Sequence, residues 1–319
     1  MWLYIFRRLL QTIPVLLGVS VVVFMTMSLL PGDPAHAILG PYATPDNVAR
    51  INAELGLDKG PVQRYFIWLG NVLHGDFSRS FSLDRPVLDE VLDRLGPTLL
   101  LAGAALVLAT AFGLLAGGVA AVRQYGWQDR LATVLVLIGI SVPSFWLGLV
   151  LILVFSVWLH WLPVSGMYAI YHGGGALDLL HHMILPAVTL AAVASGVIGR
   201  LMRTHMLEVL RQDYLRTARA KGVPERRVIL RHALRNALVN LVPVIAVQVG
   251  FLLGGAVYVE TVFQWPGIGR MLVQAVRSRD ILLVQGGVLV VAFCYVMLNL
   301  IADVVQQILD PRIRPGVQS

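Results

Sequence analysis

The chain has 319 residues, of which 57% are hydrophobic and 13% are charged, and its mean hydropathy is +0.75. Because soluble globular domains carry about 25% charged residues, this composition excludes an ordinary soluble protein and indicates a polytopic membrane protein. The net charge of +7 does not indicate nucleic acid, because the basic residues cluster beside apolar runs, as membrane topology requires. The one cysteine, Cys294, lies within an apolar run, so we expect no intramolecular disulfide and only a packing role.

The N-terminus has the order of a signal peptide, since Arg7 and Arg8 precede an uncharged run at 9–32 and the sequence at 35–37 resembles a cleavage site. The run is too long for that role, because signal peptides have apolar regions of about 7–15 residues and a span needs about 20. We therefore predict a retained first span with a cytoplasmic N-terminus.

The polar segment at 31–96 contains start and stop signals for short helices. A first helix is predicted to begin at Thr44-Pro45 and to end at Gly56. A second is predicted over 61–74, followed by a glycine stop, and a third begins near 85–86. Aromatic side chains of the second helix give this small cap a core or rest at the membrane interface. A structural cap is the main interpretation, and a docking surface is the alternative.

Five further uncharged runs are each about 17 residues or longer, which is enough to cross a hydrocarbon core of about 30 Å. They cover 97–122, 131–159, 183–199, 236–259 and 281–302. Since a bilayer offers backbone groups no hydrogen-bond partners, each run is predicted to be helical. With the first span, this makes six transmembrane helices.

Small residues and prolines inside the runs indicate how the spans pack. Close helix approach is predicted at Gly113, Gly117, Gly118, Gly139 and Gly148. Bends or helix ends are predicted at Pro143, Pro186 and Pro243. Simple helix packing is the main interpretation, and a path that opens and closes is the alternative.

Basic residues set the orientation. Sixteen of the 25 Lys and Arg residues fall in segments on one side of this topology, which is also the side of both termini. The positive-inside rule places that side in the cytoplasm. We therefore predict a multi-pass protein of the cell (inner) membrane with both termini cytoplasmic.

No enzyme motif accompanies the spans. A phosphate loop for ATP needs G-x-x-x-x-G-K-[ST], which neither Lys59 nor Lys221 fits, and H-E-x-x-H and G-x-S-x-G are missing. We therefore predict a non-catalytic chain. The outer loop contains histidines whose spacing does not suit metal ligation from one helix face, so solvated side chains without a metal are expected at His172, His181 and His182.

The sequence at 213–235, here called the basic segment, lies between two uncharged runs and must sit at the membrane surface. Its first part has good helix formers, Gly222 suits a left-handed stop, and Pro224 suits the first position of the next helix. The pattern predicts a helix, a tight turn and a second helix. The first helix is capped more fully than a linker needs, which indicates contact with a partner.

The second helix of the basic segment is predicted to be amphipathic. One face gathers Arg227, Arg231 and Arg235, and an apolar side is offered by Val228, Leu234 and Leu238. The arginines could reach lipid phosphates or a partner protein, and the sequence leaves both readings open.

The sequence RTARAKG at 216–222 resembles the cytoplasmic coupling segment of binding-protein-dependent ABC importer permeases, and more closely that of the dipeptide/oligopeptide/nickel family. Motifs similar to that family occur in the family's order along nearly the whole chain, at 7–8, 30–34, 54–58, 74–77, 213–222, 232–237, 260–263, 265–270 and 310–314. Two features depart from the wider permease pattern. Its Glu-Ala-Ala is replaced by Arg216-Thr217-Ala218, and its Ile-x-Leu-Pro is absent near 232–235, as in the peptide/nickel branch.

The resemblance implies an all-α integral membrane protein with the six-helix fold of a type I, MetI-like importer permease. It divides the chain into 1–96, the first span with a small external helical segment, and 97–319, the permease core with a cytoplasmic loop at about 204–235. The implied partners are a second homologous permease subunit, two ABC ATPase subunits, an external substrate-binding protein and membrane lipid, without nucleic acid. The chain itself would bind no cofactor, because ATP and Mg²⁺ belong to the ATPase subunits.

The resemblance also implies a mechanical role for the first helix of the basic segment, which ATPase closure would move so that the spans tilt. The residues expected to contact the ATPase are Asp213, Tyr214, Arg216, Thr217, Ala218, Arg219, Ala220, Lys221 and Gly222. The two small alanines would let the helix enter an ATPase groove, and the cations would pair with an acidic rim.

The expected cargo is a di- or oligopeptide, with nickel, a metal chelate or a glutathione-like compound as alternatives within the same family. An ion-coupled secondary transporter is a more distant alternative, which the absence of ionisable residues at the span centres disfavours. A membrane enzyme is disfavoured by the missing catalytic motifs.

Overall fold

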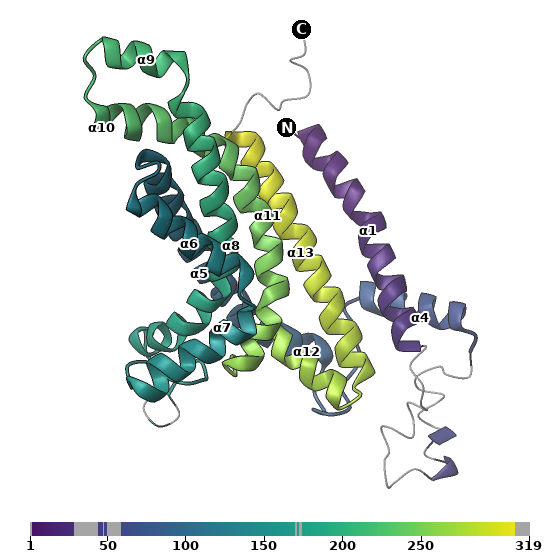
Figure 1. The fold of residues 1–319 in the computed structure, drawn as a ribbon. Coiled ribbons are helices and arrows are strands. Elements are labelled where there is room, and N and C mark those ends of the chain that lie inside the picture. The colour runs from purple at the N-terminus through teal and green to yellow at the C-terminus, as the bar shows by residue number, and fades with distance from the viewer. Residues whose placement is uncertain are drawn as a thin grey trace. The chain divides into compact units, whose positions relative to one another are not determined.

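The computed structural model describes residues 2–28, 44–46, 48–49, 59–169, 171 and 174–309. Within these ranges the chain is almost entirely helical (Figure 1), and the π-helices are labelled η. The helices are α1 (Trp2–Ser28), α4 (Pro61–Leu73), α5 (Val87–Val122), α6 (Trp127–Ser141), α7 (Ser144–Leu151), η2 (Ile152–Trp158), α8 (Ala176–Leu210), α9 (Asp213–Ala220), α10 (Glu225–Arg227), η3 (Val228–Ala233), α11 (Leu234–Val262), α12 (Ile268–Arg277) and α13 (Ile281–Leu309).

In the described part of the chain, five helices are long and apolar enough to cross a membrane. They are Phe6–Thr26 within α1, α5, α8, the continuous stretch Glu225–Val262, and Ile281–Val304 within α13. The third apolar run forms α6 and, after a short break, the consecutive helices α7 and η2. The helix axis turns by 111° between α6 and the stretch formed by α7 and η2. The six predicted spans are therefore confirmed when the bent pair counts as one span. The break falls at Pro143, so the bend or helix end predicted at this proline is confirmed.

Pro143 explains this break. The preceding residue, Val142, is extended with a ψ of 126°, because the proline ring disfavours a helical conformation at the residue before it. The other two prolines predicted to bend or end spans, Pro186 and Pro243, lie inside α8 and α11. Of these three prolines, Pro143 alone separates two helices.

The external segment joins the second span without a break. α5 begins at Val87, beside the predicted start at 85–86, and continues through Pro97 to Val122. The third external helix and the second span are thus one element.

The chain forms two compact units: a flanking unit of Met1–Pro97 and Gly267–Met297, and a core unit of Thr98–Pro266 and Leu298–Ser319.

The second external helix is confirmed as α4, which ends before Gly75, a residue with a φ of +84°. Tyr65 of α4 is buried, and its hydroxyl oxygen lies 2.8 Å from the hydroxyl oxygen of Ser20 in α1. Phe66 is exposed instead. The aromatic side chains of this helix therefore divide between packing on α1 and facing outward.

The first external helix is described only near its start. The backbone N–H of Val48 donates to the carbonyl oxygen of Thr44 at 2.9 Å, which is the first hydrogen bond of a helical turn at the predicted position. The predicted stop at Gly56 lies outside the described residues.

Asp280 ties together the flanking unit. Its Oδ2 accepts hydrogen bonds from the hydroxyl of Ser80 at 2.6 Å and from the N–H and hydroxyl of Ser82 at 2.9 and 2.8 Å. Its Oδ1 accepts the backbone N–H of Leu283 at 3.1 Å, so the same carboxylate caps the start of α13. A buried side chain with this many donors fixes the loop before α5 to the start of α13.

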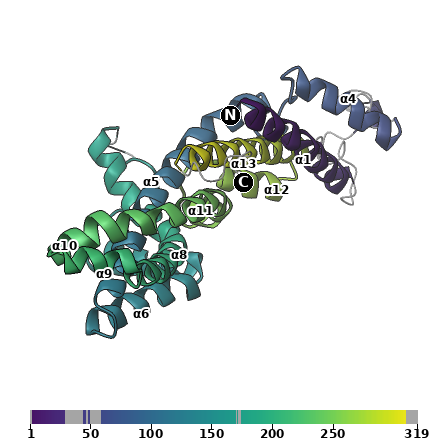
Figure 2. The same ribbon diagram turned by 90° about the horizontal axis from the view of Figure 1, so that it is seen from above.

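Within the core unit, α8 packs against α6, α7 and α11 (Figures 1 and 2). Its apolar face joins a buried cluster that includes Ile198, Leu252 and Trp265. Polar contact is added by Arg203, which donates to the two carboxylate oxygens of Asp129 in α6 at 2.8 and 2.9 Å. α8 is thus held by both apolar packing and an ion pair.

Glycines let α8 approach α5 and α6 at backbone distance. A Cβ atom on Gly117 of α5 would collide with the carbonyl oxygen of Gly199 and lie 2.7 Å from Cβ of Met202. Contacts of 2.7 to 3.0 Å would likewise be met by a Cβ on Gly113, Gly139 and Gly148, whereas one on Gly118 would have nothing nearer than 3.8 Å. The predicted close approach is confirmed at four of the five glycines and is wrong at Gly118.

Gly117→Ala is expected to destabilise the protein by about 1–3 kcal/mol, because the added methyl group would force α5 and α8 apart. Gly118→Ala is the matched control at the next residue, since its methyl group would reach only ordinary contact distance. Thermal unfolding of the two purified variants checks this, with a lower Tm expected for Gly117→Ala alone. Equal Tm values would contradict the close helix approach.

Candidate functional site

The first helix of the basic segment is confirmed as α9, which ends in a Schellman motif. The N–H of Gly222 donates to the carbonyl oxygen of Arg219 at 2.9 Å, and the N–H of Val223 donates to that of Ala218 at 3.2 Å. Gly222 has a φ of +75°, the left-handed conformation predicted for it. Asp213 lies in the first turn of α9, where its negative charge interacts favourably with the helix dipole.

Leu215 anchors α9 to the core unit. Its side chain is fully buried, although the residues on either side of it, Tyr214 and Arg216, are exposed. It belongs to a buried cluster formed with residues of α5, α8, η3 and α11, namely Ala121, Met202, Met206, Val209, Val228, Ala233, Ala237 and Leu241. Burying a leucine contributes about 1.5–3 kcal/mol, so this side chain fixes the short helix to the ends of the longer ones.

Two polar contacts add to this anchor. The side-chain amide of Asn236 in α11 donates to the hydroxyl oxygen of Tyr214 at 2.8 Å. Arg219 donates from Nε and from a terminal nitrogen to the two carboxylate oxygens of Glu225, at 3.0 and 2.8 Å. These hydrogen bonds from Arg219 to Glu225 raise the pKa of Arg219 above its ordinary value. The Arg219–Glu225 pair closes the turn between α9 and α10.

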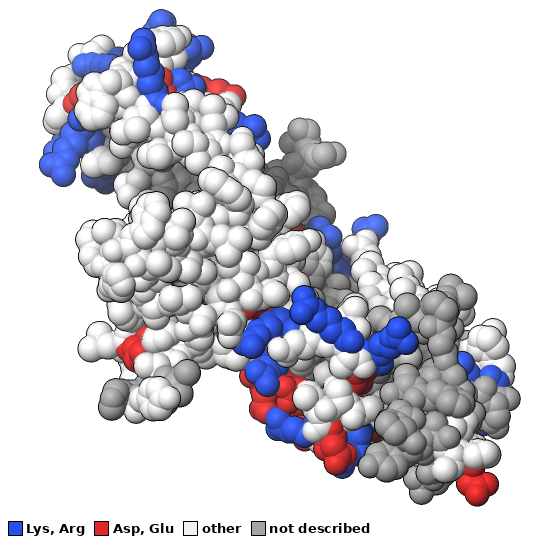
Figure 3. All heavy atoms as spheres, turned by 60° about the horizontal axis from the view of Figure 1, so that its bottom comes forward, with Lys and Arg blue, Asp and Glu red and all other residues white. Residues whose placement is uncertain are grey.

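The predicted contact residues do not all face outward. Ala218 is half-buried against the cluster around Leu215, so it packs within the protein. The other predicted residues are exposed: Asp213, Tyr214, Arg216, Thr217, Arg219, Ala220, Lys221 and Gly222. Figure 3 shows Lys and Arg side chains gathered over the end of the core unit formed by α9 and α10.

The arginines of α9 differ in the strength of their ion pairs. Arg219 forms the bidentate pair described above, whereas the exposed Arg216 lies 3.6 Å from a carboxylate oxygen of the exposed Asp213. An exposed pair at that distance stabilises little. Arg216 is therefore held less firmly than Arg219.

The second predicted helix of the basic segment is divided into α10, η3 and α11. Pro224, predicted as the first helical residue, is the N-cap residue of α10, so the helix begins one position later, at Glu225. The three arginines predicted to share a face, Arg227, Arg231 and Arg235, are all exposed.

The apolar side of this helix differs from the prediction because of the π-helix. Its fully buried residues are Val228, Ala233, Ala237 and Leu241. Val228 and Ala233 are five residues apart, which suits the wider turn of a π-helix. Ala237 and Leu241 then follow at intervals of four residues. Val228 was predicted on this side, whereas the predicted Leu234 and Leu238 are only half-buried.

The outer histidines do not behave as expected. His181 and His182 belong to α8 rather than to a loop, and His182 is buried, so the expectation of solvated side chains is wrong for it. Nδ1 of His182 lies 3.1 Å from Oδ1 of Asp178, one helical turn earlier. His172 lies outside the described residues, and no group of three potential metal ligands occurs among those that are described.

Sequence reasoning missed two buried acidic residues of the core unit. Asp129 pairs with Arg203, although 74 positions separate them. Glu260, near the end of α11, is fully buried and accepts a hydrogen bond from the hydroxyl of Thr98 at 2.6 Å. Both acids lie near the ends of apolar runs, where a carboxylate is ordinarily solvated, so only the three-dimensional packing identifies them.

Comparisons with known proteins identify the family. The model of the family described as the binding-protein-dependent transport system inner membrane component matches residues 111–315. The model of its N-terminal part matches residues 1–102. The chain belongs to this family. The protein is therefore a permease subunit of an ATP-driven ABC importer and a multi-pass inner-membrane protein, and its family works with ATPase and substrate-binding partners.

Curated relatives of this permease include the glutathione transport system permease protein GsiC of Escherichia coli strain K12 and that of Shigella dysenteriae serotype 1. Each is 43% identical over 311 residues, which is 98% of either chain. Among solved structures, an inward-facing MetNI methionine ABC transporter matches with a TM-score of 0.57 at 17% identity, covering 69% of this permease and 96% of that chain. A histidine-bound amino acid ABC transporter matches with a TM-score of 0.51 at 14% identity, covering 70% and 94%. These structures show that the fold is shared.

Gly222→Val is expected to destabilise the basic segment by more than about 1–2 kcal/mol, the ordinary cost of a left-handed conformation, because a β-branched residue resists positive φ. Gly222→Asn is the matched control, since asparagine tolerates this conformation. A Cβ at Gly222 would meet nothing within 4 Å, so the difference between the two variants reports backbone conformation alone. ATP-driven uptake and Tm should fall for valine and hold for asparagine. Equal loss with both residues would contradict this assignment.

Proposed function

We propose that this permease imports glutathione or similar short peptides. The observation that supports this most strongly is the 43% identity to glutathione permeases over 98% of the chain. Glutathione is itself a tripeptide, so this cargo agrees with the peptide class expected from the sequence. The apolar runs contain no charge at their centres, which suits a path that does not itself select among peptides.

The proposed assembly contains this chain, a second homologous permease subunit, two ABC ATPase subunits and an external substrate-binding protein. In it, this chain binds no cofactor, and ATP with Mg²⁺ is held by the ATPase subunits. Both termini and the basic segment lie in the cytoplasm, as the distribution of Lys and Arg favours. A reporter fused after Ser319 that scored as external would contradict this orientation.

The proposed coupling element is α9 with its glycine stop, residues 213–222. The proposal is supported by the contacts that join α9 to the longer helices. α9 follows α8 after only two residues, and Leu215 and the hydroxyl of Tyr214 hold it against the start of α11. Displacement of α9 by a closing ATPase pair would therefore move α8 and α11 together. Because α8 packs against α6 and α7, that motion would spread through the core unit.

Substrate class can be tested with the whole transporter reconstituted in liposomes. We expect ATP-dependent accumulation of labelled glutathione that requires the external binding protein, because that protein delivers the cargo. Parallel measurements with a dipeptide and with Ni²⁺ separate the members of the family. Accumulation of Ni²⁺ without glutathione or peptide would contradict the proposed cargo, and uptake driven by an ion gradient without ATPase subunits would contradict ATP coupling.

Coupling can be tested at Ala220, because this residue is exposed whereas Ala218 packs inside the protein. Ala220→Leu is expected to weaken binding of the ATPase subunits by roughly tenfold or more, since overpacking a close contact costs about 1–3 kcal/mol. Uptake should fall with it.

The matched control for this test is Arg226→Leu, which places the same side chain at an exposed position of α10 beyond the turn. It should bind the ATPase normally. The measurements are ATPase affinity for the purified permease pair and glutathione uptake at equal protein levels. Normal coupling in Ala220→Leu would contradict a groove that closes around α9.

A further inference from the structure

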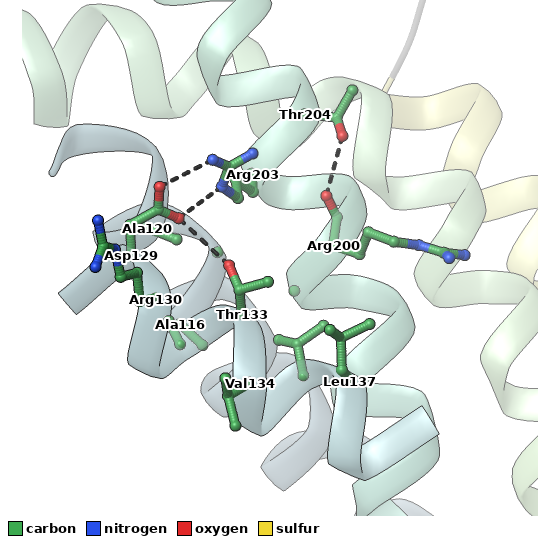
Figure 4. A pocket seen from close by; sticks show the side chains of 14 residues that line it. Ala116, Ala120, Asp129, Arg130, Thr133, Val134, Leu137, Arg200, Arg203 and Thr204 are labelled. Atoms are coloured by element: carbon green, nitrogen blue, oxygen red, sulfur yellow. Dashed lines mark hydrogen bonds and ion pairs between the residues drawn. The ribbon is translucent and has the colours of Figure 1, made fainter. Parts of the chain in front are cut away.

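A pocket of about 560 Å³ lies in the core unit between α5, α6 and α8, apart from α9. Figure 4 shows it from close by, with α6 and α8 contributing most of its side chains. α5 contributes only small residues to the wall, Ala116, Gly117 and Ala120. The proposed coupling mechanism does not use this pocket.

One end of the pocket is polar and the other is apolar. At the polar end stand Asp129, Arg130, Arg200, Arg203 and Thr204. At the apolar end, about one and a half to two turns along α6 from Asp129, stand Val134, Val136 and Leu137. The pocket thus changes from charged to hydrocarbon-like along its length, which is the order of groups in a phospholipid.

Both carboxylate oxygens of Asp129, the acid at the polar end, accept hydrogen bonds. Oδ1 of Asp129 accepts from Arg203 at 2.8 Å and lies 3.3 Å from the hydroxyl of Thr133, while Oδ2 accepts from Arg203 at 2.9 Å and from the N–H of Tyr125 at 2.9 Å. Since Arg203 balances its charge and its oxygens have donors, Asp129 offers little repulsion to an incoming anion.

Two cations remain at the rim. The ion pairs of the described residues leave Arg130 and Arg200 without a carboxylate partner, and both side chains are exposed. In Figure 4 they extend on opposite sides of the Asp129–Arg203 pair. With the Asp129–Arg203 pair neutral, the polar end has two unbalanced positive charges. Long arginine side chains can turn at a membrane surface to meet phosphate.

The surroundings of the pocket suit a lipid. Beyond it, α6 exposes an apolar face formed by Leu131, Val134, Leu135, Leu137 and Ile138. At its charged end, Tyr125 and Trp127 are both largely exposed, and these residue types gather at the membrane–water interface. An acyl chain could therefore continue along α6 from a headgroup held at the arginines.

We propose that this pocket binds an anionic phospholipid, with its phosphate at the polar end, toward which Arg130 and Arg200 turn, and an acyl chain against the apolar face of α6. Basic pockets between membrane helices bind such headgroups. A free phosphate would use the arginines but not the apolar end, and an acidic loop of a partner protein would leave the exposed apolar face of α6 without a role.

The experiment uses the complete, delipidated transporter and native mass spectrometry during titration with phosphatidylglycerol. Arg130→Gln with Arg200→Gln is expected to weaken binding by roughly fivefold per arginine, or about 25-fold together. Arg130→Lys with Arg200→Lys should retain binding, because the charges persist. The matched control, Arg277→Gln with Arg279→Gln, removes two exposed cations of the flanking unit and should leave this binding unchanged.

Three further arms identify the source of the phosphate. Phosphatidylcholine should bind far more weakly, millimolar inorganic phosphate should not displace phosphatidylglycerol, and a photoreactive phosphatidylglycerol should label peptides from α6 and α8. Unchanged affinity in the glutamine pair, equal binding of phosphatidylcholine, or displacement by inorganic phosphate would overturn the proposal. So would cross-linking of the pocket to the second permease subunit in place of lipid. If the glutamine pair does not fold, lipid selectivity and labelling of the lysine pair decide the question.

Discussion

The core unit depends on the close approach of α8 to its neighbours. Glycines on α5 and α6 remove the side chains that would hold the helices apart, as the collision of a Cβ on Gly117 with the backbone of α8 shows. In a bilayer, where lipid tails are as apolar as leucine, such contact between backbones is a principal source of helix association. The ion pair between Asp129 and Arg203 adds a directional contact to the same interface.

This packing gives α9 a rigid base. α8 ends at Leu210 and α9 begins at Asp213, so little chain separates the packed span from the short surface helix. The side chain of Leu215 is buried in the protein interior, and the side-chain amide of Asn236 donates a hydrogen bond to the hydroxyl of Tyr214. A surface helix held at several points can transmit displacement, whereas a tethered helix would only rotate about its linker.

The local features of the segment could be predicted from the sequence, because Gly222 and Pro224 have strong backbone preferences that act within a few residues. The apolar runs likewise predict helices, since a bilayer leaves the backbone no other solution. Three features depend on distant contacts and could not be predicted: the Asp129–Arg203 pair, the burial of His182, and the internal packing of Ala218. The break at Pro143 could be predicted as well, because proline restricts the backbone of the residue before it.

The π-helix shows how packing can override a local pattern. A regular α-helix places residues four apart on one face, which led to an apolar side that included Leu234 and Leu238. The wider turn of η3 instead aligns Val228 with Ala233, and both are fully buried beneath α9 in the cluster that holds Leu215. The irregular turn therefore lies where the surface helix docks, and π-helical turns are frequent at functional sites.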